Sequence, residues 1–159
     1  KYKNLEVILA TINLAGLNEG GTIAIQMAHE LVEAGFNVDT LALLDSDKDG
    51  LTNENSSWHS TRDDGITWTG SEQVSAMVTC DGVNLITVYS EEGKDGSGSS
   101  AETKNLGEAI AEEKEQHFKD DEDVGTVEII EASGTNQNNL LDSDVVTAVL
   151  DELAGGVAE

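Results

Sequence analysis

The sequence predicts an α/β fold in which a largely parallel sheet lies between layers of helices. One observation is the order strand, turn, helix, strand over residues 5–44, which is the repeating unit of parallel sheets. Another is that further short β-branched runs and helical patterns follow along the rest of the chain. The length of 159 residues is enough for one domain with its own core. We therefore expect a single three-layer αβα domain spanning residues 1–159.

The opening unit of this fold is predicted from three neighbouring segments. Residues 5–12, LEVILATI, form a short β-branched run typical of a buried strand. Residues 22–34 carry apolar side chains at helical spacing, and Gly35 follows where a left-handed C-terminal cap belongs. Residues 37–44, NVDTLALL, predict the next strand. The glycine-rich stretch NLAGLNEGG, between the first strand and the helix, is then expected to be a turn.

The remainder of the chain predicts three further strands and two further helices. The strands are short, rich in Val, Ile and Thr, and bounded by turn residues, whereas the helices carry capping signals and apolar stripes. A polar, turn-rich stretch over residues 45–73 precedes them. We expect strands at 74–80, 83–90 and 126–132, a helix at about 101–118, and a last helix from Asp142 or Ser143 to Gly155.

Charge is the strongest compositional signal in the chain. Thirty-two acidic residues and eight basic ones give a formal net charge of −24. A surface of this kind repels phosphate backbones, so we expect no nucleic-acid partner. It indicates either a high-salt habitat or a cation-rich extracellular setting, where counterions screen the repulsion. No apolar run approaches the roughly 20 residues that a membrane-spanning helix needs.

A calcium loop is predicted directly after the second strand, in DSDKDGLTNENS. Alternate oxygen ligands and a central glycine have the spacing of EF-hand loops, which the segment resembles, as it does thrombospondin type 3 repeats. Ser56 replaces the glutamate that closes such a loop, so one ligand is missing. The competing interpretation is a solvated acidic turn. The candidate calcium ligands are Asp45, Asp47, Asp49 and Asn53, with Gly50 at the sharp turn.

The glycine-rich stretch also raises the hypothesis of a phosphate-binding loop. GGTIAIQMAHELVEAG, LLDSD and VEIIEASG are similar in order to the loop-helix, the next strand end and the Walker B region of partition-type ATPases. A Walker loop needs a lysine that meets the phosphates. No lysine or arginine lies between Lys3 and Lys48. This resemblance therefore implies a P-loop ATPase-like domain that lacks its lysine.

A longer resemblance covers nearly the whole chain. GLNEGGTIAIQMAHELVEAGFNV, VSAMVTCDGVNLITVYS and VEIIEASGTNQNNLLDSDVV occur in the same order as segments of the zinc-dependent N-acetylmuramoyl-L-alanine amidases, which cleave peptidoglycan. The resemblance places a zinc-ligand glutamate at Glu19 and the catalytic base at Glu131. The family's first zinc histidine has no counterpart, and the second falls at Thr79 or Cys80. Cys80 is then the residue that could supply a thiolate ligand.

The amidase resemblance implies a function, and the composition suggests an alternative. The implied activity is zinc-dependent cleavage of the lactyl-peptide amide of peptidoglycan by a secreted or cell-wall-associated hydrolase, in an intact or degenerate form. The alternative is a non-catalytic acidic protein, extracellular or from a virion, that cations stabilise. The oligomeric state follows from neither.

The candidate residues share one predicted location. Ligands of open parallel sheets bind outside the carboxyl ends of the strands. Glu19, Asp45, Cys80 and Glu131 all stand at or just beyond predicted strand ends. We therefore expect a site at this edge of the sheet, with Glu19 and Glu131 close together.

Overall fold

The computed structural model describes residues 11–46, 60–61, 67–68, 78, 82–91, 107–112, 115, 124–136 and 138–155. Its strands are β1 (Ile12–Leu17), β2 (Val38–Leu44), β3 (Ser60–Thr61), β4 (Thr67–Trp68), β5 (Asn84–Ser90) and β6 (Val127–Ala132). Its named helices are α1 (Glu19–Glu33), the short 3-10 helix η2 (Leu140–Asp142) and α5 (Asp144–Gly155), and residues 107–112 are also helical.

Four strands form the sheet on which the described fold is built. Their order is β1-β2-β5-β6, and each neighbouring pair is parallel. The short strands β3 and β4 pair separately and are antiparallel. The predicted α/β class with a largely parallel sheet is therefore confirmed. Because the strands are parallel, the carboxyl ends of all four lie at the same edge of the main sheet.

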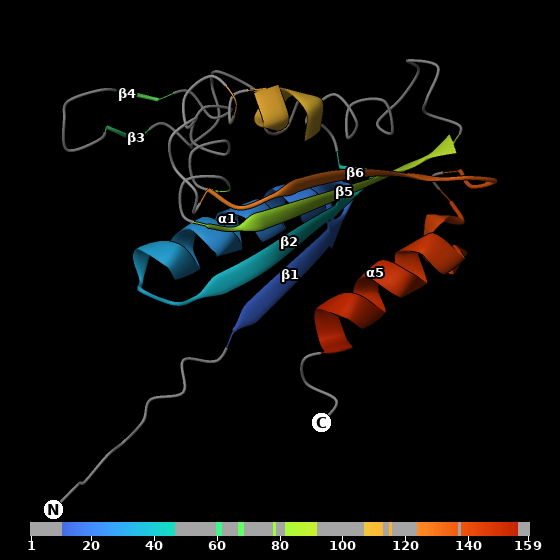
Figure 1. The fold of residues 1–159 in the computed structure, drawn as a ribbon, viewed down its shortest axis with the longest axis horizontal. Coiled ribbons are helices and arrows are strands. Elements are labelled where there is room, and N and C mark those ends of the chain that lie inside the picture. Colours follow the sequence, from blue (N-terminus) through green and yellow to red (C-terminus); the bar gives the residue numbers. More distant parts are fainter. Residues whose placement is uncertain are drawn as a thin grey trace, which may run out of the picture.

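Helices cover both faces of this sheet, and α1 and α5 lie on opposite sides of it (Figure 1). The side chains of β2 explain this arrangement. Successive side chains of a strand point to opposite faces of the sheet, and those of β2 are apolar on both faces. Leu41 and Leu43 pack in a cluster with α1, whereas Ala42 and Leu44 pack in a cluster with α5. A strand that is apolar on both faces needs a helix on each side, which gives the three predicted layers.

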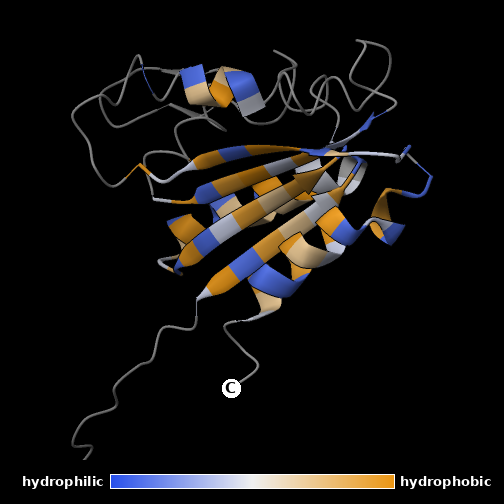
Figure 2. Ribbon diagram, turned by 45° about the vertical axis from the view of Figure 1, so that its right-hand side comes forward, coloured by the Kyte–Doolittle hydropathy of each residue, from blue (hydrophilic) through white to orange (hydrophobic). Residues whose placement is uncertain are grey.

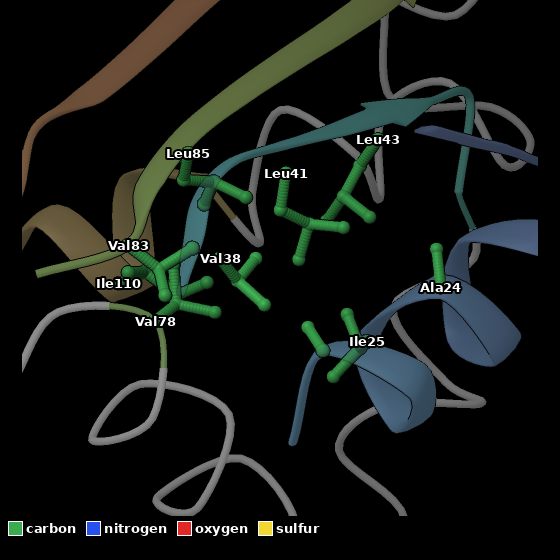
Figure 3. Close-up of a cluster of buried hydrophobic side chains, with 10 residues drawn as sticks. Ala24, Ile25, Val38, Leu41, Leu43, Val78, Val83, Leu85 and Ile110 are labelled. Atoms are coloured by element: carbon green, nitrogen blue, oxygen red, sulfur yellow. The ribbon is translucent and has the colours of Figure 1, made fainter. Parts of the chain in front are cut away.

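The α1 side of the sheet holds the larger group of buried aliphatic side chains (Figure 3). Ile25 of α1 and Leu85 of β5 are fully buried there, and Ile110 from the helical residues 107–112 completes the layer. Each fully buried aliphatic side chain contributes roughly 1.5–3 kcal/mol relative to exposure. Hydropathy colouring shows apolar residues running along the strands between the helices (Figure 2). The fold therefore rests on aliphatic packing, as the low aromatic content requires.

The strand that precedes α1 extends beyond the predicted end at Ile12, as far as Leu17. Residues 5–10 lie outside the described part of the chain, but Asn13–Leu17 belong to β1 and do not form the expected turn. The helix starts at Glu19 and not at Thr22. The prediction was wrong because small residues hide the strand pattern. Leu14 packs on the α1 side and Leu17 on the α5 side, whereas Ala15 and Gly16 between them are small.

The glycines of this region permit close approach. A Cβ on Gly16 would lie 2.1 Å from the carbonyl oxygen of Gly20, so the end of β1 and the first turn of α1 touch through backbone. A Cβ on Gly21 would lie 1.8 Å from the Oγ atom of Ser46, just after β2. Glycine at these positions lets α1 begin directly against the ends of two strands.

The other predicted boundaries agree more closely with the structure. Gly35 has the expected positive φ, 86°, and the N–H of Phe36 donates to the carbonyl oxygen of Leu31 at 2.9 Å, as in a Schellman cap. Strands β2, β5 and β6 each begin one residue after the predicted start. The predicted strand at 74–80 lies outside the described residues except for Val78, which is helical.

Candidate functional site at the carboxyl ends of the strands

Four polar residues lie in register across the carboxyl edge of the sheet. Each belongs to one of the four strands or directly follows it. Tyr89 of β5 pairs in register with Glu131 of β6. Asp45 follows the last paired residue of β2, and Asn18 follows the last paired residue of β1. We call these four residues, Asn18, Asp45, Tyr89 and Glu131, the rim row. They cross the edge where open parallel sheets bind ligands.

Asp45 is the most buried member of the rim row. Its exposed fraction is 0 %, and its backbone N–H donates to the carbonyl oxygen of Val88 at 2.9 Å. Its φ of 47° turns the backbone out of the strand, and the Oδ1 atom instead accepts the N–H of Ser90 at 2.8 Å. The carboxylate thus continues the β2–β5 hydrogen bonding after the strand has ended. Its Oδ2 atom is also buried and has no hydrogen-bond partner among the described residues.

Asn18 occupies the equivalent place after β1. It is the only residue between β1 and α1, with φ 51° and ψ −120°. Its N–H donates to the carbonyl oxygen of Leu44 at 2.9 Å, and its own carbonyl oxygen accepts the N–H of Gly21 at 3.0 Å. The side chain does not cap α1, and its buried Oδ1 atom has no hydrogen-bond partner in the described part of the chain. A non-glycine residue in such a conformation costs about 1–3 kcal/mol.

Glu131 and Tyr89 form the other half of the rim row. The Tyr89 hydroxyl donates to Oε2 of Glu131 at 3.3 Å, and the Ser133 hydroxyl lies 3.5 Å from Oε1. Nearby, the Glu91 carboxylate accepts the N–H of Gly134. This half is therefore bound into local hydrogen bonds, whereas the half formed by Asn18 and Asp45 contains the buried acceptors without described partners.

The two glutamates that the amidase resemblance singles out lie at opposite ends of the edge. Glu19 is the first residue of α1, next to β1, and Glu131 is on β6. Because β1 and β6 are the first and last strands of the described sheet, three strand spacings of about 4.8 Å, roughly 14 Å in all, separate them. The expected edge is the same for both, but the structure does not bring their backbones side by side.

Most of the remaining predicted ligands lie on residues that the structure does not describe. Asp45 is described, whereas Asp47, Asp49, Asn53 and Cys80 lie outside the described residues. Within the described part of the chain, no group of three or more His, Cys, Asp or Glu side chains is placed to hold a metal ion. In the same part, no helix combines the length and the apolar character that crossing a bilayer requires.

The connection between β1 and α1 bears on the phosphate-loop hypothesis. A Walker loop wraps phosphates with several backbone N–H groups between its strand and its helix. Here β1 ends at Leu17 and α1 begins at Glu19, so a single residue links them. This link is too short to wrap a phosphate group.

Sequence reasoning missed Asn18, the residue that makes this link. A usable signal was present, because asparagine is among the few non-glycine residues that adopt positive φ, and it stands directly before an acidic residue and two glycines. Placing it required knowing that the strand continues through Leu17.

The comparisons with known proteins add no relative to this picture. No family model matches the chain, and no curated protein and no solved structure matches it. Functional inference therefore depends on the rim row and on the charge of the molecule.

Proposed function

We propose that the protein is a non-catalytic binding domain whose ligand site is the carboxyl edge of the sheet and whose fold cations stabilise. The observation that supports this most directly is the burial of the Asp45 carboxylate at that edge. Buried charged groups are normally paired, hydrogen-bonded or bound to a ligand. One carboxylate oxygen of Asp45 has a partner and the other has none among the described residues. Such an oxygen favours a binding role for this edge.

The charge distribution supports the dependence on cations. Thirty-two acidic residues stand against eight basic ones, which gives the chain a formal net charge of −24. Helices α1 and α5 have no basic residue in their last turns, where Glu33 and Glu152 instead face the negative end of the helix dipole. Counterions would reduce this repulsion, which suits an extracellular or high-salt setting.

A second candidate is the amidase-like hydrolase, and one contact favours it. Glu131 is half-buried at the carboxyl edge and accepts a hydrogen bond from Tyr89, which would hold the carboxylate in place as a general base. A catalytic zinc site needs three protein ligands. Among the described residues no group of three such ligands occurs, and Cys80 and the side chain of Glu19 lie outside them.

A peptidoglycan turbidity assay separates the two functions. We expect the folded protein, supplied with zinc, to produce no clearing above the rate without protein. The hydrolase predicts clearing that falls by roughly a hundredfold or more in Glu131→Gln. Glu128→Gln serves as the matched control, because Glu128 is an exposed glutamate on the same strand, away from the edge. Clearing lost in the first variant and kept in the second would contradict the non-catalytic proposal.

A further inference from the structure

We propose that Asn18 and Asp45 bind a hard divalent cation, calcium or magnesium, that joins the ends of β1 and β2. This inference rests on the proposed function, because it takes the carboxyl edge as the binding site, and it goes further by naming the ligand. The ligand atoms are Oδ2 of Asp45 and Oδ1 of Asn18.

Two buried acceptor atoms without described partners carry the inference. Leaving a buried acceptor without a hydrogen bond is costly, and for a carboxylate oxygen the cost is larger. Here two such atoms belong to residues that follow paired positions of neighbouring strands. The backbone N–H of Asn18 donates to the residue preceding Asp45, which fixes the two residues side by side. One positive ligand between the strand ends would satisfy both atoms.

The chemistry of the two atoms selects the class of cation. A carboxylate oxygen and an amide oxygen are the ligands that calcium and magnesium take, whereas zinc in proteins prefers nitrogen and sulfur. The N-terminus of α1 lies next to Asn18, but its dipole is worth about half a positive charge and offsets only part of the carboxylate charge.

Backbone conformation agrees with this assignment. Asn18 and Asp45 are the two non-glycine residues with positive φ in the described part of the chain. Strained residues of this kind cluster at ligand sites, where the strain fixes the direction of a side chain. At Asp45 the turn also lets Oδ1 bond to the N–H of Ser90. That bond gives one carboxylate oxygen a structural role and leaves the other oxygen for a ligand.

Calorimetric titration of the full chain tests the inference. The protein is dialysed against EDTA and then into a fixed excess of sodium chloride, and calcium or magnesium chloride is added at constant ionic strength. We expect one saturable binding event and a melting temperature that rises with the divalent cation. Asp45→Asn keeps an oxygen for Ser90 and removes the charge, and Asn18→Gly removes the amide oxygen. Each should weaken binding by roughly tenfold or more.

Matched variants locate the binding event. Glu128→Gln removes an exposed carboxylate away from the edge and should leave the affinity unchanged. Asp49→Asn lies in the calcium-loop motif and should have less effect than Asn18→Gly. If Asp45→Asn fails to fold, Asn18→Gly decides the question.

Three results would overturn the inference. In the first, the wild-type protein shows no saturable binding. In the second, Asn18→Gly binds the cation with the same affinity as wild type. In the third, only Asp49→Asn loses binding. A buried water that bridges the two oxygens would give the first result, because stability would then not depend on the divalent cation. The proposed cation-stabilised function fails separately, through a melting temperature that does not respond to monovalent salt.

Discussion

Asn18 combines two features that lower the stability of the folded protein when no ligand is bound. Its φ of 51° and ψ of −120° belong to a region that glycine enters far more easily than asparagine. Its buried Oδ1 atom adds a second cost when no ligand is bound. Costs of this kind are typical of residues at ligand sites.

Replacing Asn18 by glycine should stabilise the cation-free protein. The substitution relieves backbone strain and removes the buried acceptor, so we expect the free energy of unfolding to rise by about 1 kcal/mol in urea denaturation with EDTA present. Asn37→Gly is the control, because Asn37 is exposed and is not among the described residues with positive φ. That variant should lose a few tenths of a kcal/mol or more through the entropy of the unfolded chain. Equal losses in both variants would mean that Asn18 is not strained.

The sequence predicts one residue of the proposed site, Asp45, but not the contacts that this residue makes. Asp45 could be identified because it begins a spacing of acidic residues that calcium loops share, and it directly follows an apolar strand. The bond from Ser90 to its carboxylate could not be identified, since it joins residues 45 positions apart in the chain. Such contacts follow from strand order, which is a property of the whole sheet.

The first turn of α1 is the element on which the geometry of the edge depends. Gly20 and Gly21 are neighbours in the same helical turn but have different surroundings. Nothing lies within 4 Å of a Cβ built on Gly20, whereas one on Gly21 would meet Ser46 at 1.8 Å. The second glycine therefore sets the distance between α1 and the end of β2.

This contrast gives a paired prediction for alanine substitutions. Gly20→Ala should stabilise the protein by roughly 0.5–1 kcal/mol, because alanine favours the helix and meets no obstacle. Gly21→Ala should destabilise it by about 1–3 kcal/mol, because the methyl group forces Ser46 and the helix apart. Chemical denaturation of the two variants beside wild type measures both effects. A stabilised Gly21→Ala protein would show that α1 is not packed against the end of β2.

Elements with strong patterns were predicted well and β1 was not, for a physical reason. β5 has the sequence NLITVYS, in which β-branched and aromatic residues favour a strand by themselves. β1 has the sequence INLAGL, in which Ala15 and Gly16 have little strand preference. Its pairing with β2 and its contact with α5, through the bond from Asn13 Nδ2 to the carbonyl oxygen of Leu153, hold it in place. Those are tertiary interactions, which a local pattern does not contain.

The order of the strands determines which residues are neighbours at the carboxyl edge of the sheet. The sequence predicts a parallel sheet and the edge where the acidic residues gather, but it does not fix which strands are neighbours. The order β1-β2-β5-β6 puts β1 beside β2 and far from β6. Asn18 and Asp45 are thereby brought together, whereas the expected partners Glu19 and Glu131 are separated. The proposed binding site is therefore argued from Asn18 and Asp45, at the ends of β1 and β2, and not from a pair formed by Glu19 and Glu131.

The net charge predicts a strong response of stability to monovalent salt. We expect the melting temperature to rise steadily between low and molar sodium chloride, because counterions screen the repulsion among carboxylates. A variant with Glu30, Glu33, Asp151 and Glu152 neutralised to their amides should respond less steeply, which distinguishes screening from the general effect of salt on apolar burial. Parallel slopes for the two proteins would contradict the proposed role of cations.

Locating a cation directly is the most decisive measurement for the proposed site. Manganese can stand in for the hard cation, because it shares the preference for oxygen ligands and scatters anomalously. In a crystal soaked with manganese, the account predicts an anomalous peak within about 2.0–2.6 Å of Oδ2 of Asp45 and Oδ1 of Asn18. A difference map that shows only a water between these atoms, with manganese bound elsewhere or not at all, would contradict it.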